Sequence, residues 1–138
     1  EPLRGASGEI FVGLGTLEYA AYSPDGKYIA TCGGAGGFLW DVETGTAIRM
    51  FSGGMGSAYS IVFSPDGKKV LMASGNGTAS LWDTGTGELI RTFLGHGDVV
   101  NSVAFSSDGT KVLTGRWDGT ARIWDVSEYA DIERWVVY

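Results

Sequence analysis

The sequence predicts an all-β fold made of three consecutive units, each with four antiparallel strands. Trp-Asp pairs recur 42 residues apart, at Trp40-Asp41, Trp82-Asp83 and Trp124-Asp125. A second mark, a turn sequence that ends in Asp-Gly, precedes each pair in the same register, at residues 23–26, 64–67 and 106–109. The composition of 23 Gly and 3 Pro in 138 residues suits short strands joined by tight turns. Two independent marks in one register therefore indicate an internal repeat.

The third unit shows the expected elements most clearly. Residues Val99 to Phe105 are almost wholly apolar, which is typical of a strand buried near the centre of a fold. Asp108-Gly109 follows and is expected to supply the positive-φ positions of a tight hairpin turn. A second strand is predicted over Lys111 to Gly115, and Asp118-Gly119 forms the turn that leads to the third strand.

The third strand is predicted over Thr120 to Trp124, where Ala121 and Ile123 face one side and Arg122 and Trp124 the other. A fourth is expected over roughly 130–137, with counterparts at 47–51 and 89–93. Four strands in about 40 to 45 residues are the pattern of a β-propeller blade. The predicted divisions are an N-terminal segment (1–15), blade 1 (16–51), blade 2 (52–93) and blade 3 (94–138).

The chain resembles the WD-repeat (Trp-Asp repeat) β-propeller family over essentially residues 9–138. The third unit matches best, through Gly95-His96, residues 105–109, residues 118–120 and Ile123-Trp124-Asp125. The resemblance implies propeller blades, three in this chain. It says little about individual function, because one fold hosts many functions.

One group of residues in the third unit has two interpretations. His96, Thr114 and Asp118 could be the base, nucleophile and orienting carboxylate of a hydrolase. The resemblance implies instead that His96, Thr114, Asp118 and Trp124 form a buried structural chain of hydrogen bonds. The second unit lacks the first three groups and has Gly54, Met72 and Asn76 there. We therefore expect the full network in blade 3 alone and more reliance on packing in the other two.

Several function classes are disfavoured by the residues present. The net charge of −6 argues against nucleic acid, because phosphate binding needs a basic surface. The sequence does not suggest membrane insertion, because it contains neither an apolar stretch of about 18 residues nor a polybasic patch. Nucleotide-binding, nucleophile-elbow and calcium-loop motifs are missing from the sequence, and the single Cys32 has no zinc-ligand spacing. We expect no enzyme activity, no metal and no cofactor.

A partner surface is implied by the resemblance, at the end of the propeller where the first strand of each blade begins. The matching positions are Trp117, Tyr59, Ser57, Asn101, Val99 and Glu18. Trp117 lies in a turn, where no strand face can bury it. It is interpreted either as an anchor for a partner or as local packing on a neighbouring blade.

Three blades also predict self-association. Propellers typically close with about 4–8 blades, so both terminal blades are expected to expose an apolar face. Head-to-tail contact would give a ring of six or nine blades from two or three copies, or an open filament. Residues 7–10 are similar in sequence to residues 86–89, which predicts an outer strand at the N-terminal end. This strand and the one expected at 130–137 would compete for the same outer edge of a blade. Strand exchange between subunits and a fragment of a longer propeller both fit this duplication.

The predicted function is a non-catalytic protein–protein interaction scaffold that self-assembles head-to-tail into a larger propeller. The alternatives are a structural protein that forms filaments or lattices, and a fragment of a longer WD-repeat scaffold. Another protein on the propeller face is a further expected partner. The compartment stays open: the cytoplasm is favoured, with secretion as the alternative if Glu1 is a processed N-terminus.

Overall fold

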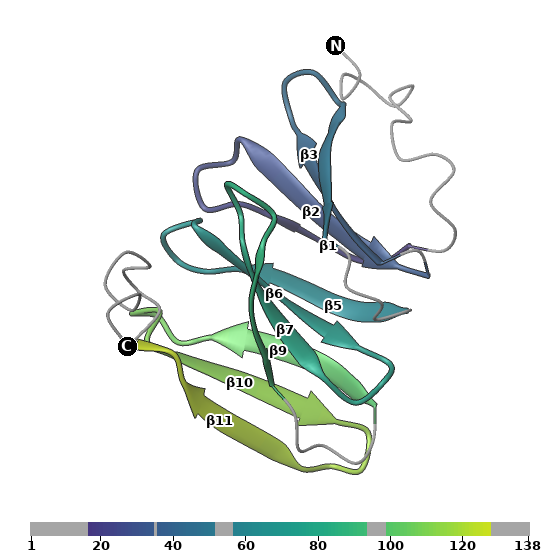
Figure 1. Ribbon diagram of the computed structural model, residues 1–138, viewed down its shortest axis with the longest axis vertical. Coiled ribbons are helices and arrows are strands. Elements are labelled where there is room, and N and C mark those ends of the chain that lie inside the picture. The colour runs from purple at the N-terminus through teal and green to yellow at the C-terminus, as the bar shows by residue number, and fades with distance from the viewer. Residues whose placement is uncertain (1–16, 35, 52–56, 94–98, 128–138) are drawn as a thin grey trace.

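The computed structural model describes residues 17–34, 36–51, 57–93 and 99–127, which form three antiparallel sheets (Figure 1). The first sheet contains β1 (Leu17–Tyr22), β2 (Tyr28–Gly33), β3 (Gly36–Asp41) and β4 (Ala47–Phe51). The second contains β5 (Ala58–Phe63), β6 (Lys69–Ser74), β7 (Ala79–Asp83) and β8 (Leu89–Phe93). The third contains β9 (Val100–Phe105), β10 (Lys111–Arg116) and β11 (Ala121–Asp125). The predicted all-β class is confirmed, and we call these sheets blades 1, 2 and 3.

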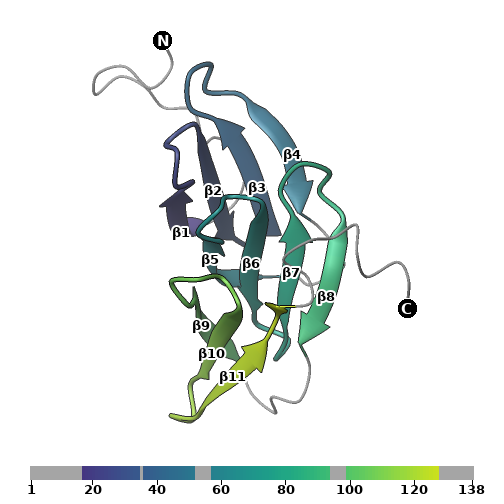
Figure 2. The ribbon, with the colours of Figure 1, turned by 90° about the vertical axis from the view of Figure 1, so that its left-hand side faces the viewer.

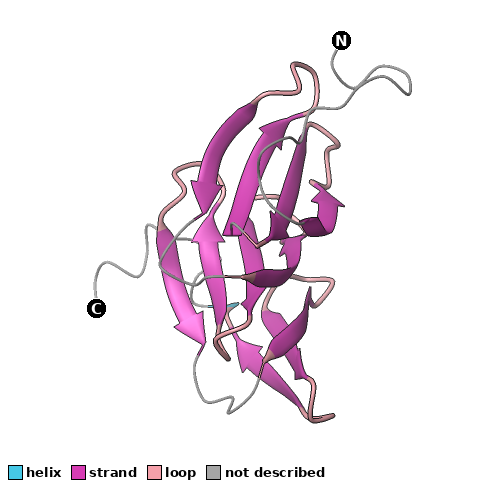
Figure 3. Ribbon diagram, turned by 90° about the vertical axis from the view of Figure 1, so that its right-hand side faces the viewer, coloured by secondary structure: helices cyan, strands magenta, loops and turns pink. Residues whose placement is uncertain are grey.

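Each blade runs outward from its first strand, in the order β1 to β4 and β5 to β8 (Figure 2). Short turns connect the strands (Figure 3). The first strands carry the contact between blades, since β5 packs against β1 and β2, and β9 packs against β5 and β6. The described residues form an open row of three blades and do not close into a ring. The predicted outer strand at 130–137 and the N-terminal segment lie outside the described residues.

The hydrophobic core consists of two layers, one between each pair of neighbouring blades. The layer between blades 1 and 2 contains Ala30, Cys32, Leu39, Phe51, Ala58, Ile61, Val70, Met72 and Trp82. The layer between blades 2 and 3 contains Leu71, Ala73, Ala79, Leu81, Phe93, Val100, Val103, Val112 and Val126. Each blade is therefore stabilised mainly by the neighbour on which it stacks, as in other repeat architectures.

One predicted detail of the first hairpin in blade 3 was wrong. Of the two turn residues, Gly109 has a positive φ, of 77°, and Asp108 does not. The hairpin is closed by the Ser106 N–H, which donates to the Lys111 carbonyl at 2.9 Å, so the loop holds four residues rather than two. The Asp108 carboxylate accepts hydrogen bonds from the Ser106 hydroxyl at 2.8 Å and the Thr110 N–H at 3.0 Å. These bonds stabilise the turn with Asp108 in an ordinary backbone conformation.

Candidate functional site

Three of the four residues of the predicted hydrogen-bond network in blade 3 lie within the part of the protein that the structure describes. The Trp124 indole N–H donates to the Thr114 hydroxyl at 3.1 Å, and Thr114 is fully buried. Asp118 accepts from the Thr120 N–H at 2.9 Å and lies 3.0 Å from the Arg116 guanidinium. His96 lies outside the described residues. The pairing of Thr114 with Trp124 is thus observed, and the link through His96 stays a prediction.

The corresponding tryptophans of the first two blades differ from each other. In blade 1 the Trp40 indole N–H donates to the Thr31 hydroxyl at 3.0 Å, so this blade keeps the same pair as blade 3. In blade 2 the Trp82 indole N–H is buried and makes no hydrogen bond within the described part of the chain, because Met72 takes the place of the threonine. Thr31 was not among the residues predicted for this network. Counting from the Asp-Gly turn at 25–26, rather than back from the tryptophan, would have found it.

Replacing Thr114 with Val should destabilise the protein by about 1–3 kcal/mol, because the buried Trp124 indole N–H would lose its acceptor while the volume stays similar. Urea denaturation followed by tryptophan fluorescence would measure the loss. The matched control is Thr46→Val, which changes an exposed hydroxyl and should stay within about 0.5 kcal/mol of wild type. Equal stability of the two variants would contradict the structural role of Thr114.

Two of the predicted partner-binding residues come together at the end where the first strands begin. The rings of Tyr59 and Trp117 lie in contact, with centroids 6.0 Å apart and planes at 46°. The Trp117 N–H donates to the Val99 carbonyl at 3.3 Å, and the Ser57 carbonyl accepts from the Gly75 N–H at 3.0 Å. Ser57 and Val99 therefore anchor the turns at this end through their backbones.

The remaining two predicted positions are exposed at this end. Glu18 is the second residue of β1, and Asn101 is the second residue of β9. Neither makes a side-chain hydrogen bond within the described residues that would fix its orientation. All six predicted positions thus belong to strand starts or turns at one end of the row of blades.

A second candidate surface is the sheet face of blade 3 that points away from blade 2. Leu113 and Ile123 are paired across β10 and β11, and they are 44% and 71% exposed. Their counterparts in the earlier blades are paired in the same way and buried: Ala30, Leu39, Leu71 and Leu81. Blade 3 therefore presents to solvent the face on which blades 1 and 2 each receive the next blade.

The expected exposure of blade 1 was only partly right. Leu17, at the start of β1, is 44% exposed. Ile29 and Trp40, however, are only 8% and 5% exposed, and Leu39 packs against blade 2. The apolar pattern of a strand does not by itself show which of its side chains stay in contact with solvent.

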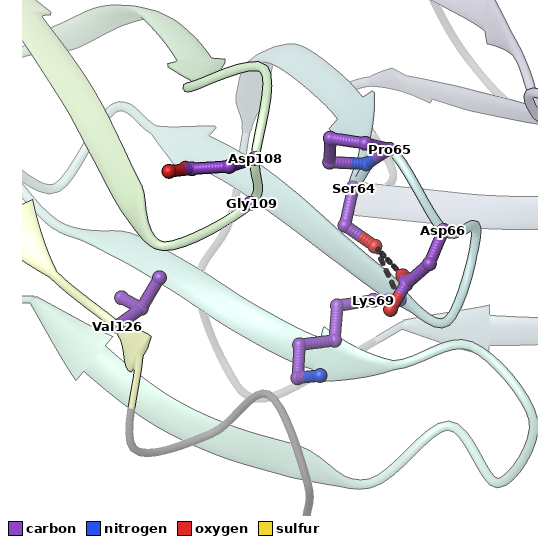
Figure 4. Close-up of a pocket in the computed structure, with 7 residues that line it drawn as sticks. All are labelled: Ser64, Pro65, Asp66, Lys69, Asp108, Gly109 and Val126. Atoms are coloured by element: carbon purple, nitrogen blue, oxygen red, sulfur yellow. Dashed lines mark hydrogen bonds between the residues drawn. The ribbon is translucent and has the colours of Figure 1, made fainter.

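A small pocket lies between the first hairpin turns of blades 2 and 3 (Figure 4). Its lining residues are Ser64, Pro65, Asp66, Lys69, Asp108, Gly109 and Val126. The Ser64 hydroxyl donates to Asp66 at 2.6 Å and accepts from the Lys69 N–H at 3.0 Å, so it is used in closing its own turn. Hydrogen bonds from Thr110 and Ser106 lower the pKa of Asp108 to about 2, which keeps this carboxyl ionised at neutral pH. These groups hold turns together and include no base paired with a nucleophile.

The described residues provide no group of three or more His, Cys, Asp or Glu side chains placed to hold a metal ion. Burial raises the pKa of the Cys32 thiol to about 12, so this side chain is a neutral part of the core at physiological pH. Within the same residues there is no helix long and apolar enough to cross a membrane.

The fold defines a class of protein: a tandem array of antiparallel β-propeller blades. A family model described as "WD domain, G-beta repeat" matches residues 45–83 and 87–125, and the chain belongs to this WD40 family. No curated protein matches the chain. Each matched repeat begins before the outer strand of one blade and ends at the Trp-Asp of the next. The sequence repeat is thus offset from the structural blade by one strand.

Proposed function

We propose that this WD40 chain is a non-catalytic protein–protein interaction scaffold in which blade 3 of one copy packs against blade 1 of another. WD40 repeats imply the scaffold role. The head-to-tail contact is supported by one observation above the others: Leu113 and Ile123 are exposed where the equivalent side chains of both earlier blades are buried.

The two interfaces inside the chain serve as a template for the proposed contact. In blade 2, Leu71 and Leu81 are covered by the Val100, Val103 and Val112 side chains of blade 3. Leu113 and Ile123 offer the same pair of large apolar groups, and full burial of such a side chain stabilises by about 1.5–3 kcal/mol. A WD-type blade is therefore the surface that fits this face.

Blade 1 of a second copy is the blade we propose for this position. Leu17 of β1 is exposed and corresponds to Ala58 of β5 and Val100 of β9, which meet the preceding blade in the interfaces within the chain. A contact between different surfaces of identical chains is heterologous, so it gives a ring if the rotation closes and a filament if it does not. Two copies would contribute six blades and three copies nine.

Light scattering coupled to size exclusion tests this proposal on the 138-residue chain. We expect the wild type to have a mass of two or three times 14.6 kDa, or to grow as a filament, and the Ile123→Glu variant to run at 14.6 kDa. The control is Leu89→Glu, which changes an exposed leucine on the outer strand β8 and should assemble like wild type. A wild-type chain that is a folded single copy at micromolar concentration would contradict the proposed contact.

A further inference from the structure

The Tyr59–Trp117 pair joins blades 2 and 3 and leaves a large aromatic surface in water. The Trp117 residue is 61% exposed, although its ring touches Tyr59. The blade fold does not require an aromatic residue in this turn, because the corresponding position of blade 2 is Gly75. Trp117 is therefore a feature of this one turn and not of the repeat.

The two rings are held in place from below. A Cβ atom added to Gly75 would lie 2.9 Å from Cε2 of Tyr59, so the tyrosine ring lies directly against the Gly75 backbone on one side and meets Trp117 on another. The Trp117 backbone is fixed by its bond to Val99 and by the Gly119 N–H, which donates to the Arg116 carbonyl at 3.2 Å. A ligand would meet a surface that is already ordered, which reduces the entropy lost on binding.

The charges around the pair favour a cation. The positive charge of the neighbouring Arg116 is balanced by the Asp118 carboxylate at 3.0 Å, and the Arg116 guanidinium also donates to the Thr120 hydroxyl at 2.6 Å. Glu18 is exposed at the same end of the blades, and the chain as a whole carries a net charge of −6. The negative electrostatic potential of the chain would thus attract a positively charged group.

Guanidinium groups of the chain already stack on two of its other aromatic rings, Phe93 and Trp124. The Arg91 guanidinium lies 4.7 Å from the Phe93 ring centroid and 5.8 Å from that of Trp124, and Arg122 lies 6.0 Å from the Trp124 ring. No cation of the described residues stacks on Tyr59 or Trp117. Trp117, which is 61% exposed, therefore keeps ring surface available to a cation from another molecule.

We infer that Tyr59 and Trp117 form a docking site for a cationic side chain, arginine or lysine, in a basic segment of a partner protein. The site uses the strand-start end of blades 2 and 3, whereas the proposed self-association uses the sheet face of blade 3. It rests on the scaffold role of the chain and not on head-to-tail contact, so each can fail without the other.

The probe is an acetylated peptide with four arginines spaced by Gly-Ser, paired with the same peptide in which neutral citrulline replaces each arginine. Titration is followed by calorimetry and by the Trp117 indole N–H signal in a ¹⁵N spectrum, at about 0.15 M salt to screen non-specific attraction. We expect the arginine peptide to shift the Trp117 signal and the citrulline peptide to leave it unchanged.

The Trp117→Ala variant should bind the arginine peptide at least about tenfold more weakly, as expected for loss of a cation–π contact of 1.4 kcal/mol or more. The matched control is Tyr22→Ala, which removes another exposed aromatic ring, at the far end of β1, and should bind like wild type. The titration is repeated in the Ile123→Glu background, which keeps the aromatic pair, so that assembly and peptide binding are measured separately. Equal binding by Trp117→Ala, equal binding of the citrulline peptide, or no binding of the arginine peptide would each overturn the inference.

Discussion

Replacing Phe93 with Ala is expected to lower the free energy of unfolding by about 3–5 kcal/mol, the largest loss we predict for any single substitution in this chain. Phe93 ends the outer strand of blade 2 and is fully buried. Its ring lies 5.1 Å from that of Trp124 in blade 3, centroid to centroid, with the planes at 52°. Removal of the ring would leave a cavity between two blades and expose one face of Trp124, so both packing and burial are lost.

The same contact recurs at the other interface, where Phe51 and Trp82 have ring centroids 5.8 Å apart. Blades 1 and 2 therefore each contact the tryptophan of the next blade with a phenylalanine from their outer strand. Urea denaturation should show the loss in Phe93→Ala, and Leu89→Ala on the same strand is the control, since Leu89 is exposed and its loss should stay near about 0.5 kcal/mol. A change below about 1 kcal/mol for Phe93→Ala would contradict the central role of this ring pair.

The second large effect is a coupling between Gly37 and Met72, which face each other across blades 1 and 2. A Cβ atom at Gly37 would lie 2.6 Å from the Met72 sulfur and 3.4 Å from a methyl group of Ile61. Gly37→Ala should therefore cost about 1–3 kcal/mol through overpacking. At the interface between blades 2 and 3, Ala79 takes the place of Gly37 and Thr114 takes the place of Met72. There too a smaller residue lies opposite a larger one.

Met72→Thr should relieve that clash and give the buried Trp82 indole N–H the hydroxyl acceptor that Thr31 and Thr114 supply in the other blades. Alone, this change loses apolar packing and gains a hydrogen bond, so we expect a net cost of about 1–2 kcal/mol.

The double variant Gly37→Ala/Met72→Thr should lose about 1–2 kcal/mol less free energy of unfolding than the two single variants lose in total. Denaturation of the four proteins in the cycle measures this coupling. Additive effects would show that the two side chains do not compete for the same space.

Local pattern predicted the strands well. The outer strands expected at 47–51 and 89–93 match β4 and β8, and the inner strands differ by a residue at most ends. These elements follow from alternation and turn residues, which act over a few positions. The details that were missed depend on exact spacing: the four-residue loop around Asp108 and the shifted position of Thr31, which lies one residue closer to its tryptophan than Thr114 does to Trp124.

Sequence alone determined the three blades and their common plan, because a period of 42 residues with two marks in register leaves little freedom for the strands. Tertiary structure decided that two of three nearly identical faces are covered and that the third is exposed. Leu81 and Ile123 occupy the same place in their blades, yet one is fully buried and the other is 71% exposed. It also decided that Tyr59 meets Trp117, since the two belong to different blades. Burial and ring contact depend on which segments lie beside a strand in space. The residues next to a side chain in the sequence do not specify those segments.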